Sequence, residues 1–286
     1  MDETGLPSGG DLRHGRYLRP GRYPLSGGSL RSGRPLLAAS ARPWAGALLA
    51  CCVILVIVLG AIFARQSTAD WFDHAVDAPV VGWLGGHRGL ARWLAAPGSL
   101  IPAVLLSAAV AVACLLAGRL NGAVLAMTAV PVAEGVTEGL LKPLVHRTLL
   151  GGISYPSGHT TASVALAATV TVLLLVPPRP AMARVARAAI PAAAYALAVG
   201  VAIGLIGLRW HYFTDTVAGA AVGIGTVCGL ALILDSRVVR RRLTPRSTAA
   251  DLGPRHGRRH PPPASRTEPG PASDPVSRRP LDLKSA

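Results

Sequence analysis

Apolar residues are concentrated in six long stretches that are separated by polar or basic segments. A helix that crosses the hydrocarbon core of a bilayer needs about 20 mostly apolar residues. The first stretch is the clearest, because no charged residue lies between Trp44 and Ala64. The pattern predicts an all-α fold, a six-transmembrane helical bundle, with spans at residues 44–65, 98–118, 121–141, 158–177, 185–207 and 213–234.

Composition supports a membrane protein. The chain has 286 residues, of which 51% are hydrophobic and only 15% are charged, yet its formal net charge is +15. A soluble domain needs more charge to cover its surface. Basic and apolar residues must therefore be segregated along the chain, which is typical of a membrane protein with basic tails and not of a nucleic-acid-binding protein. The four cysteines lie in apolar runs, and their spacing does not indicate a metal site.

The two ends of the chain lack apolar periodicity. Residues 1–43 are rich in Gly, Pro, Ser and Arg, and residues 236–286 are rich in Arg and Pro, so both are predicted to be disordered basic tails. Residues 44–235 then form the membrane domain. An even number of spans places both tails on one side, and the positive-inside rule makes that side cytoplasmic. Three connecting segments then face outward: 66–97, 142–157 and 208–212.

The outward segment 66–97 mixes tryptophan with aspartate, as in Trp71, Trp83 and Asp73. Tryptophan at such a position usually forms a belt at the membrane interface. The alternative is that these side chains guide a lipid towards a site. The sequence predicts a loop here and leaves both roles open.

Three polar patches lie at the predicted outward ends of the spans: Lys142 to Arg147, Ser154 to Thr161, and Arg209 to Asp215. Ionisable groups at membrane depth are costly and usually functional. The predicted topology brings all three patches to one membrane face, although the topology was not used to choose them. We therefore expect a single site at that face.

The second patch suits an anion. Ser157 and Gly158 stand at a predicted helix start, where free backbone N–H groups and the positive end of the helix dipole can hold a phosphate. Ser157 can cap the helix or donate its hydroxyl, and Gly158 permits close approach to the backbone. The alternative is an ordinary serine cap after a proline turn.

The third patch suits nucleophilic catalysis. His211 and Asp215 are four residues apart, so on a helix they lie on one face. A carboxylate bound to one imidazole nitrogen leaves the other poised as a nucleophile. The alternative is a pair of only local electrostatic value. In the first patch, Lys142 and Arg147 can clamp phosphate oxygens, or they can be ordinary interfacial cations.

Together, Pro156-Ser157-Gly158-His159 and His211-x3-Asp215 resemble the type 2 phosphatidic acid phosphatase (PAP2) family. The family pattern is Lys-x6-Arg-Pro, then Pro-Ser-Gly-His, then Ser-Arg-x5-His-x3-Asp. The resemblance runs from about residue 71 to residue 233 and implies a PAP2-type core in the cell membrane. It also implies a metal-independent phosphatase without a cofactor, which acts on a membrane lipid phosphate or pyrophosphate, with polyprenyl carriers as one option, at the outer face.

The resemblance also implies a role for each site residue. His211 is expected to attack phosphorus and form a phosphohistidine, with Asp215 orienting its ring. His159 is expected to protonate the leaving oxygen and then to activate water. The residues expected to hold the phosphate oxygens are Lys142, Arg147, Ser157, Gly158 and Arg209.

The chain departs from the family pattern at both arginines. Leu149-Leu150 stand where the family has Arg-Pro, and Leu205 stands where the third motif has Arg. Arg147 lies two residues early and is expected to compensate for the first arginine. Arg209 lies about one helical turn after Leu205, so it is expected to compensate for the second if that segment is helical. These departures keep two alternatives open: a catalytically weak protein that binds or transports lipid phosphates, and a lipid phosphotransferase.

One further polar stripe lies within the third span. Glu134, Glu138 and Lys142 follow one another at intervals of four residues, so they share a helix face. The favoured interpretation is internal neutralisation of Lys142. A proton relay and a contact with a lipid headgroup are the alternatives. The sequence leaves the oligomeric state open.

Overall fold

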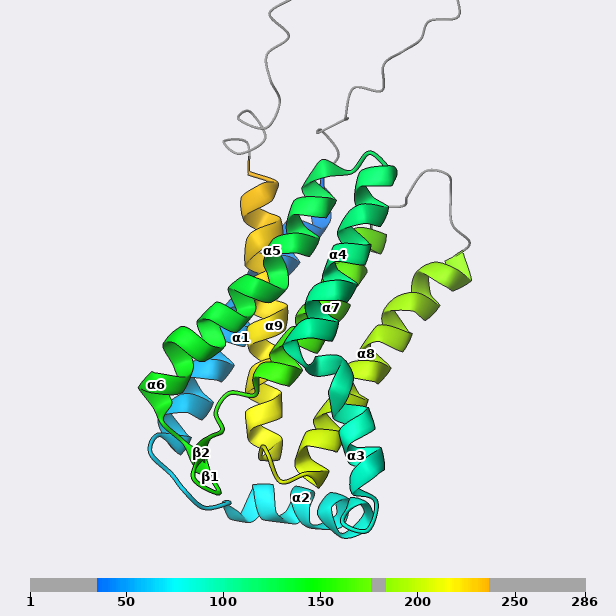
Figure 1. The fold of residues 1–286 in the computed structure, drawn as a ribbon. Helices are drawn as coiled ribbons and strands as arrows, with labels where there is room; N and C mark the ends of the chain where they lie inside the picture. The colour runs from blue at the N-terminus through cyan, green and yellow to red at the C-terminus, as the bar shows by residue number, and fades with distance from the viewer. Residues whose placement is uncertain (1–34, 176–183, 237–286) are drawn as a thin grey trace, which may run out of the picture. The chain divides into compact units, whose positions relative to one another are not determined.

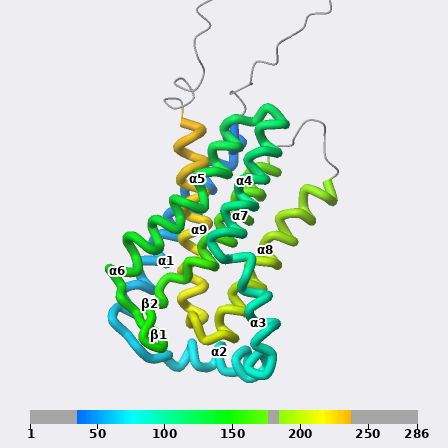
Figure 2. The backbone as a smooth tube through the Cα atoms, viewed as in Figure 1, coloured from blue at the N-terminus to red at the C-terminus, as the bar shows by residue number. Residues whose placement is uncertain are grey.

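A computed structural model describes residues 35–175 and 184–236 of the chain. The described part is helical apart from one short two-stranded hairpin (Figures 1 and 2). Most of the two predicted tails, residues 1–34 and 237–286, lies outside the described residues.

The first half of the described chain contains two short 3-10 helices and four α-helices: η1 (Ala39–Ala41), α1 (Arg42–Phe63), α2 (Trp71–Leu84), α3 (Arg88–Ala95), η2 (Ala96–Gly98) and α4 (Leu100–Leu116). The second half contains a π turn, five α-helices and the hairpin: α5 (Leu120–Val136), η3 (Thr137–Leu141), α6 (Lys142–Val145), β1 (Thr148–Leu149), β2 (Gly152–Ile153), α7 (Gly158–Leu175), α8 (Arg184–Gly207) and α9 (Phe213–Leu234).

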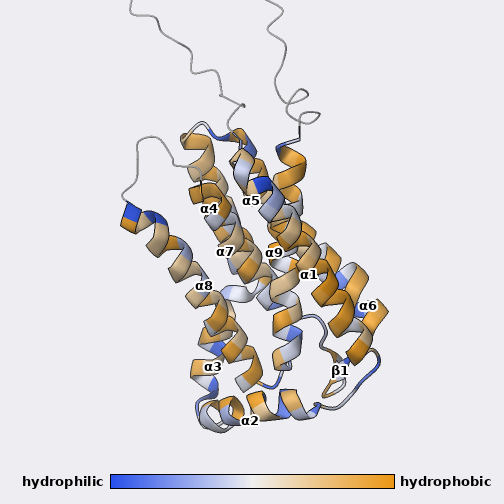
Figure 3. Ribbon diagram, turned by 180° about the vertical axis from the view of Figure 1, so that it is seen from behind, coloured by the Kyte–Doolittle hydropathy of each residue, from blue (hydrophilic) through white to orange (hydrophobic). Residues whose placement is uncertain are grey.

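The prediction of an all-α bundle is confirmed. Within the described residues, five helices are long and apolar enough to cross a membrane. A sixth span arises when Arg88–Gly98 and Leu100–Leu116, which are bent by 44° at Ser99, are taken as one. Hydrophobic residues occupy much of the length of these helices (Figure 3). A lipid-facing surface requires this distribution, because hydrocarbon cannot solvate polar groups.

The predicted loop 66–97 is largely helical. Asp70 caps α2 by accepting a hydrogen bond from the Asp73 N–H at 2.7 Å, which satisfies one of the free donors of the first turn. In Figure 1, α2 lies across the lower end of the bundle and covers it. The sequence prediction missed α2 and α3 because both are shorter than a membrane span.

The third span also extends beyond its predicted end at residue 141. The π turn η3 leads directly into α6, and Pro143 follows at this junction. The continuous helix Leu120–Val145 therefore carries Lys142 within its last turns.

The folded body begins before the predicted boundary at residue 44. The backbone N–H groups of Leu36 and Leu37 donate to the Asp235 carboxylate at 2.8 and 2.9 Å, and both leucines are buried. Arg42 lies 3.6 Å from the same carboxylate. The two ends of the described body therefore meet.

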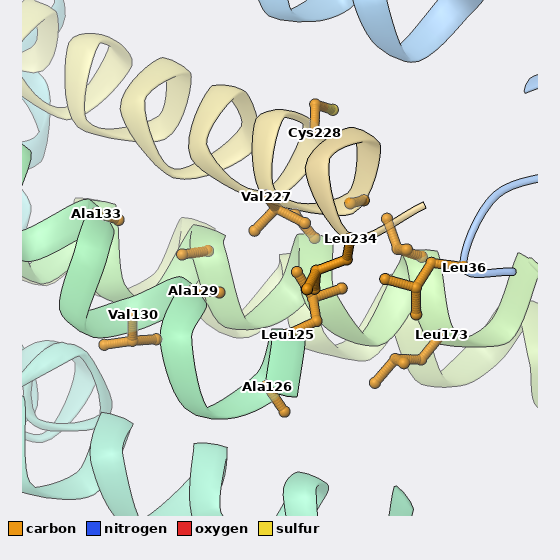
Figure 4. Close-up of a cluster of buried hydrophobic side chains, with 14 of the residues drawn as sticks. Leu36, Leu125, Ala126, Ala129, Val130, Ala133, Leu173, Val227, Cys228 and Leu234 are labelled. Atoms are coloured by element: carbon orange, nitrogen blue, oxygen red, sulfur yellow. The ribbon is translucent and has the colours of Figure 1, made fainter. Parts of the chain in front are cut away.

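Small residues allow the central helices to approach closely. Figure 4 shows Ala126, Ala129 and Ala133 of α5 in the buried cluster that also contains Val227 of α9. Between α7 and α9, a Cβ added at Gly223 would lie 2.8 Å from both the Thr161 carbonyl oxygen and the Ala165 nitrogen. Only glycine fits there, so α7 and α9 are locked in one register.

That register places the site. The start of α7, the α8–α9 connection and the end of α6 all lie in the lower half of the bundle in Figure 1. The Ser157 N–H donates to the Asp215 carbonyl oxygen at 3.0 Å, which joins the first turns of α7 and α9. The three polar patches therefore converge at one end of the bundle.

The close contact between α7 and α9 yields a test of stability. We expect Gly223→Ala to lower the free energy of unfolding by about 1–3 kcal/mol, because its methyl group has no room against α7. Gly229→Ala on the same helix is the control, since a Cβ there meets only Leu49 Cδ2, at 3.8 Å. Denaturant unfolding of the detergent-solubilised protein measures both. Equal loss in the two variants would contradict the packing argument.

Candidate active site

His211 lies in the connection between α8 and α9 and is held in one tautomer. Its Nδ1 is 2.8 Å from the Ser154 carbonyl oxygen. A carbonyl oxygen can only accept, so Nδ1 carries the proton and the lone pair is on Nε2. Burial lowers the pKa of His211 to about 3, with neighbouring Lys142 and His159 acting in the same direction. The imidazole is therefore neutral at physiological pH and nucleophilic at Nε2.

Asp215 does not hold the His211 ring directly. Its Oδ2 is 4.0 Å from His211 Nδ1, which is too far for a hydrogen bond. Instead, Oδ2 accepts the Tyr212 N–H at 3.0 Å, and Oδ1 accepts from Arg147 Nη1 at 2.7 Å. Asp215 thus caps α9 and fixes the loop that carries His211. The orienting contact expected of Asp215 is made by the Ser154 carbonyl.

Arg147 is fully buried and bridges two carboxylates. Its Nη1 donates to Asp215, and its Nη2 donates to Asp73 Oδ2 at 2.6 Å. The guanidinium also lies between the rings of Phe63 and Tyr212, 4.1 and 4.2 Å from their centres. This position differs from the phosphate clamp expected from the sequence, because no part of the side chain reaches the surface. The sequence reasoning missed the partner Asp73, which lies 74 residues away on α2.

Ser157 is likewise buried. Its Oγ lies 3.1 Å from Thr160 Oγ1 and accepts the Thr160 N–H at 3.4 Å, so the side chain caps α7. Gly158 follows as the first residue of α7. A Cβ at Gly158 would lie 2.7 Å from Glu138 Oε1, so this glycine accommodates a carboxylate of the third span. The alternative of a capping serine after a proline turn describes Ser157 as the structure places it.

His159 and Lys142 lie beside the start of α7. His159 is half-buried, and its ring lies 6.1 Å from that of Trp210, centre to centre. A Cβ at Gly98 of η2 would lie 3.0 Å from His159 Cβ, so the bend before α4 packs directly on this histidine. Lys142 Nζ forms an ion pair with Glu138 Oε1 at 2.7 Å. His159 and Lys142 are both close enough to His211 to disfavour a positive charge on it.

Arg209 lies beyond the end of α8, in the left-handed conformation with φ 58°. The segment is therefore not helical at Arg209, and the reasoning from one helical turn does not apply. The side chain is exposed and, with His211, lines a cavity of about 500 Å³. Asp77 and His74 of α2 also line this cavity. Burial raises the pKa of Asp77 to about 7, and Asp73 adds to the effect.

The candidate site thus brings together His211, His159 and Lys142, with Arg209 at the adjoining cavity. It leaves Arg147, Asp215 and Ser157 in supporting positions. Among residues 35–175 and 184–236, no group of three or more His, Cys, Asp or Glu side chains is placed to hold a metal ion.

Comparison with models of protein families gives a match. The family model described as the PAP2 superfamily matches residues 49–238, which is well over half of the chain. No curated protein and no solved structure matches.

The buried guanidinium generates a prediction that separates a structural role from a phosphate-binding one. We expect Arg147→Met to lower the free energy of unfolding by about 3–5 kcal/mol, because two buried carboxylates lose their partner. Arg147→Lys should recover little of this, since one ammonium cannot reproduce the fork that bridges both carboxylates. Thermal unfolding in detergent measures the loss. A variant of normal stability that no longer binds phosphate would instead restore the phosphate-clamp role.

Proposed function

The chain belongs to the PAP2 superfamily, and on that premise we propose that it is a membrane lipid phosphate phosphatase that works through a phosphohistidine on His211. The observation that carries the proposal is the hydrogen bond from His211 Nδ1–H to the Ser154 carbonyl. It fixes a neutral ring with a free Nε2, which is the state that a nucleophilic histidine needs.

The reaction proceeds in two displacements. The Nε2 lone pair of His211 forms a bond to phosphorus while the bond to the lipid oxygen breaks. His159 donates a proton to that oxygen and releases the lipid alcohol, or the lipid monophosphate if the substrate is a pyrophosphate. His159, now neutral, takes a proton from water, whose oxygen attacks phosphorus. The P–N bond breaks, inorganic phosphate leaves, and both histidines return to their starting states.

Positive charge around the phosphoryl group comes from Lys142, Arg209 and the N-terminal end of α7. Charge on the equatorial oxygens grows or is redistributed in the transition state, so fixed cations and helix N–H groups stabilise it. Asp215 and Arg147 act indirectly, because they hold the loop on which His211 stands. Fewer residues therefore hold the phosphate oxygens than the sequence predicted.

The location of the site supports a lipid substrate. The site lies where α7 and α9 begin, at one end of a bundle whose helices are apolar along their length (Figure 3). A lipid phosphate can keep its chain in the bilayer while its headgroup reaches His211. We propose a phosphomonoester or pyrophosphate of a membrane lipid, polyprenyl carriers included, at the outer face of the cell membrane with both termini in the cytoplasm.

One observation favours a second candidate function. Arg147 is buried, and Leu205, which stands where the family has arginine, is also buried. A protein with this reduced clamp can bind a lipid phosphate and turn it over slowly, or pass the phosphoryl group to another lipid. Phosphate release from the purified protein distinguishes these outcomes.

We expect His211→Ala to lower phosphate release from a panel of lipid phosphates by at least about 10³-fold, because the nucleophile is lost. His87→Ala, at an exposed histidine before α3, is the control and should keep wild-type activity. Mass spectrometry of the rapidly quenched wild-type protein should detect phosphate on the peptide that contains His211. Equal release by wild type and His211→Ala would exclude the phosphatase proposal, and binding without release would favour the second candidate.

Arg209 provides a separate test of the clamp. We expect Arg209→Ala to lower kcat/KM by about tenfold or more, since a hydrogen bond to a charged phosphate is lost. Arg209→Lys should recover part of the activity, because the positive charge remains. Steady-state kinetics on one lipid phosphate measures both variants. Unchanged kcat/KM in Arg209→Ala would show that the exposed guanidinium does not contact the substrate.

A further inference from the structure

Two carboxylates of the third span lie at the start of α7, where a phosphate is expected to bind. A Cβ added at Gly158 would lie 2.7 Å from Glu138 Oε1 and 3.1 Å from Glu134 Oε2. The N-terminal end of a helix attracts anions. In this chain, the protein's own acidic groups already lie beside that end of α7.

Glu138 is the member of the pair that a ligand can reach. Its side chain is half exposed, whereas Glu134 Oε1 is buried without a hydrogen-bond partner among the described residues. The π turn η3, which includes Glu138, widens the helix at this point. Such turns often occur at functional sites, because they redirect a side chain without ending the helix.

The ion pair between Glu138 and Lys142 does not prevent Lys142 from binding phosphate. An ammonium group has three donors, and the 2.7 Å contact with Glu138 uses one of them. A phosphoryl group held by the other donors would therefore have the Glu138 carboxylate as an immediate neighbour. The other charged groups that face Glu138 are Glu134 on α5 and His159 on α7.

An ionised carboxylate can only accept hydrogen bonds. Next to a fully ionised oxyanion it is repulsive, but next to an oxyanion that carries a proton it accepts a strong, charge-assisted hydrogen bond. A phosphate ester has a second pKa of about 6, so its protonated monoanion is available near neutral pH. Sulfate has a similar size and carries no proton at neutral pH.

We propose that Glu138 is a specificity-determining residue of the phosphate site. Its carboxylate accepts a hydrogen bond from the protonated oxygen of a monoanionic phosphoryl group, and it repels oxyanions that have no proton to donate. The inference rests on the proposed function for the location of the phosphate. It also accounts for the polar stripe of the third span, since Glu138 then both pairs with Lys142 and contacts the headgroup.

Ligand binding tests the proposal without relying on turnover. The probes are inorganic phosphate, which keeps a proton at pH 7, and sulfate, added to the full-length protein in detergent. Binding is measured from the rise in Tm with anion concentration. We expect the wild type to prefer phosphate by on the order of tenfold. Glu138→Gln should bind the two anions within about threefold of each other, mainly by gaining affinity for sulfate.

Two further variants serve as controls. Glu138→Asp keeps the charge and should keep part of the preference for phosphate. Glu134→Gln removes the neighbouring charge but not the partner of Lys142, and its preference should match the wild type. A wild type that binds sulfate as tightly as phosphate, or a Glu138→Gln variant with an unchanged ratio, would overturn the proposal.

A pH profile provides a test on the wild type alone, should Glu138→Gln fail to fold. The KM for a short-chain lipid phosphomonoester should rise as pH increases through about 6, because the substrate loses the proton that Glu138 requires. A flat profile would count against the proposal. If no lipid phosphate is hydrolysed but the anion preference still depends on Glu138, the phosphatase function fails and the specificity role stands. If lipid phosphates are hydrolysed but the protein shows no anion preference, the specificity role of Glu138 fails and the phosphatase function stands.

Discussion

The candidate site depends on the two ion pairs of the buried Arg147 guanidinium. A buried charge is costly unless it is paired, and Arg147 pairs with carboxylates from α2 and α9 and contacts the rings of Phe63 and Tyr212. Its partners come from segments far apart in the sequence. The ion pairs therefore bring the cross-lying helix α2 against the start of α9 and close the end of the bundle around the loop that bears His211. Without the arginine, two carboxylates would remain in a dry environment, and the same residues that now hold the loop would repel each other.

The position of Arg147 also determines how His211 is oriented. The Ser154 N–H donates to the Arg147 carbonyl oxygen at 2.9 Å, and the Ser154 carbonyl in turn accepts from His211 Nδ1. The backbone that follows the arginine thus sets the tautomer of His211. This arrangement leaves Asp215 free to cap α9 and to balance the guanidinium. A carbonyl stabilises a positive imidazolium less than a carboxylate does, because it carries only a partial charge. The neutral ring is therefore the resting state, and the 4.0 Å separation of Asp215 from Nδ1 keeps a negative charge close by.

Local pattern accounts for what the sequence predicted correctly, and long-range pairing accounts for what it missed. Membrane spans can be predicted because a helix that crosses the hydrocarbon core needs about 20 consecutive apolar residues. Motif order and an even span number then suffice to gather His159, His211 and Lys142 at one end. No sequence pattern in either segment indicates that Arg147 pairs with Asp73. An arginine near a membrane face has the same sequence context whether its side chain binds a phosphate or is buried in the protein. Ser157 presents the same ambiguity, because a capping hydroxyl and a ligand-binding hydroxyl occupy the same position in the motif. The Ser154 carbonyl was beyond sequence reasoning, because every residue has one.

In the proposed function Arg147 lies outside the phosphate clamp, and this changes the charge balance of the site. Lys142 and Arg209 remain as cations near His211, and Glu138 offsets Lys142 at 2.7 Å. This reduced field suits a monoanion better than a dianion, because the attraction rises in proportion to the charge of the ligand, whereas the cost of removing its water rises with the square of that charge. A monoanion is also the better substrate for a neutral histidine, since attack on a dianion brings the lone pair towards a more negative phosphoryl group. The tautomer fixed by Ser154 and the charge offset by Glu138 thus favour the same ionisation state of the proposed substrate, although Ser154 lies in the connection before α7 and Glu138 lies in the third span.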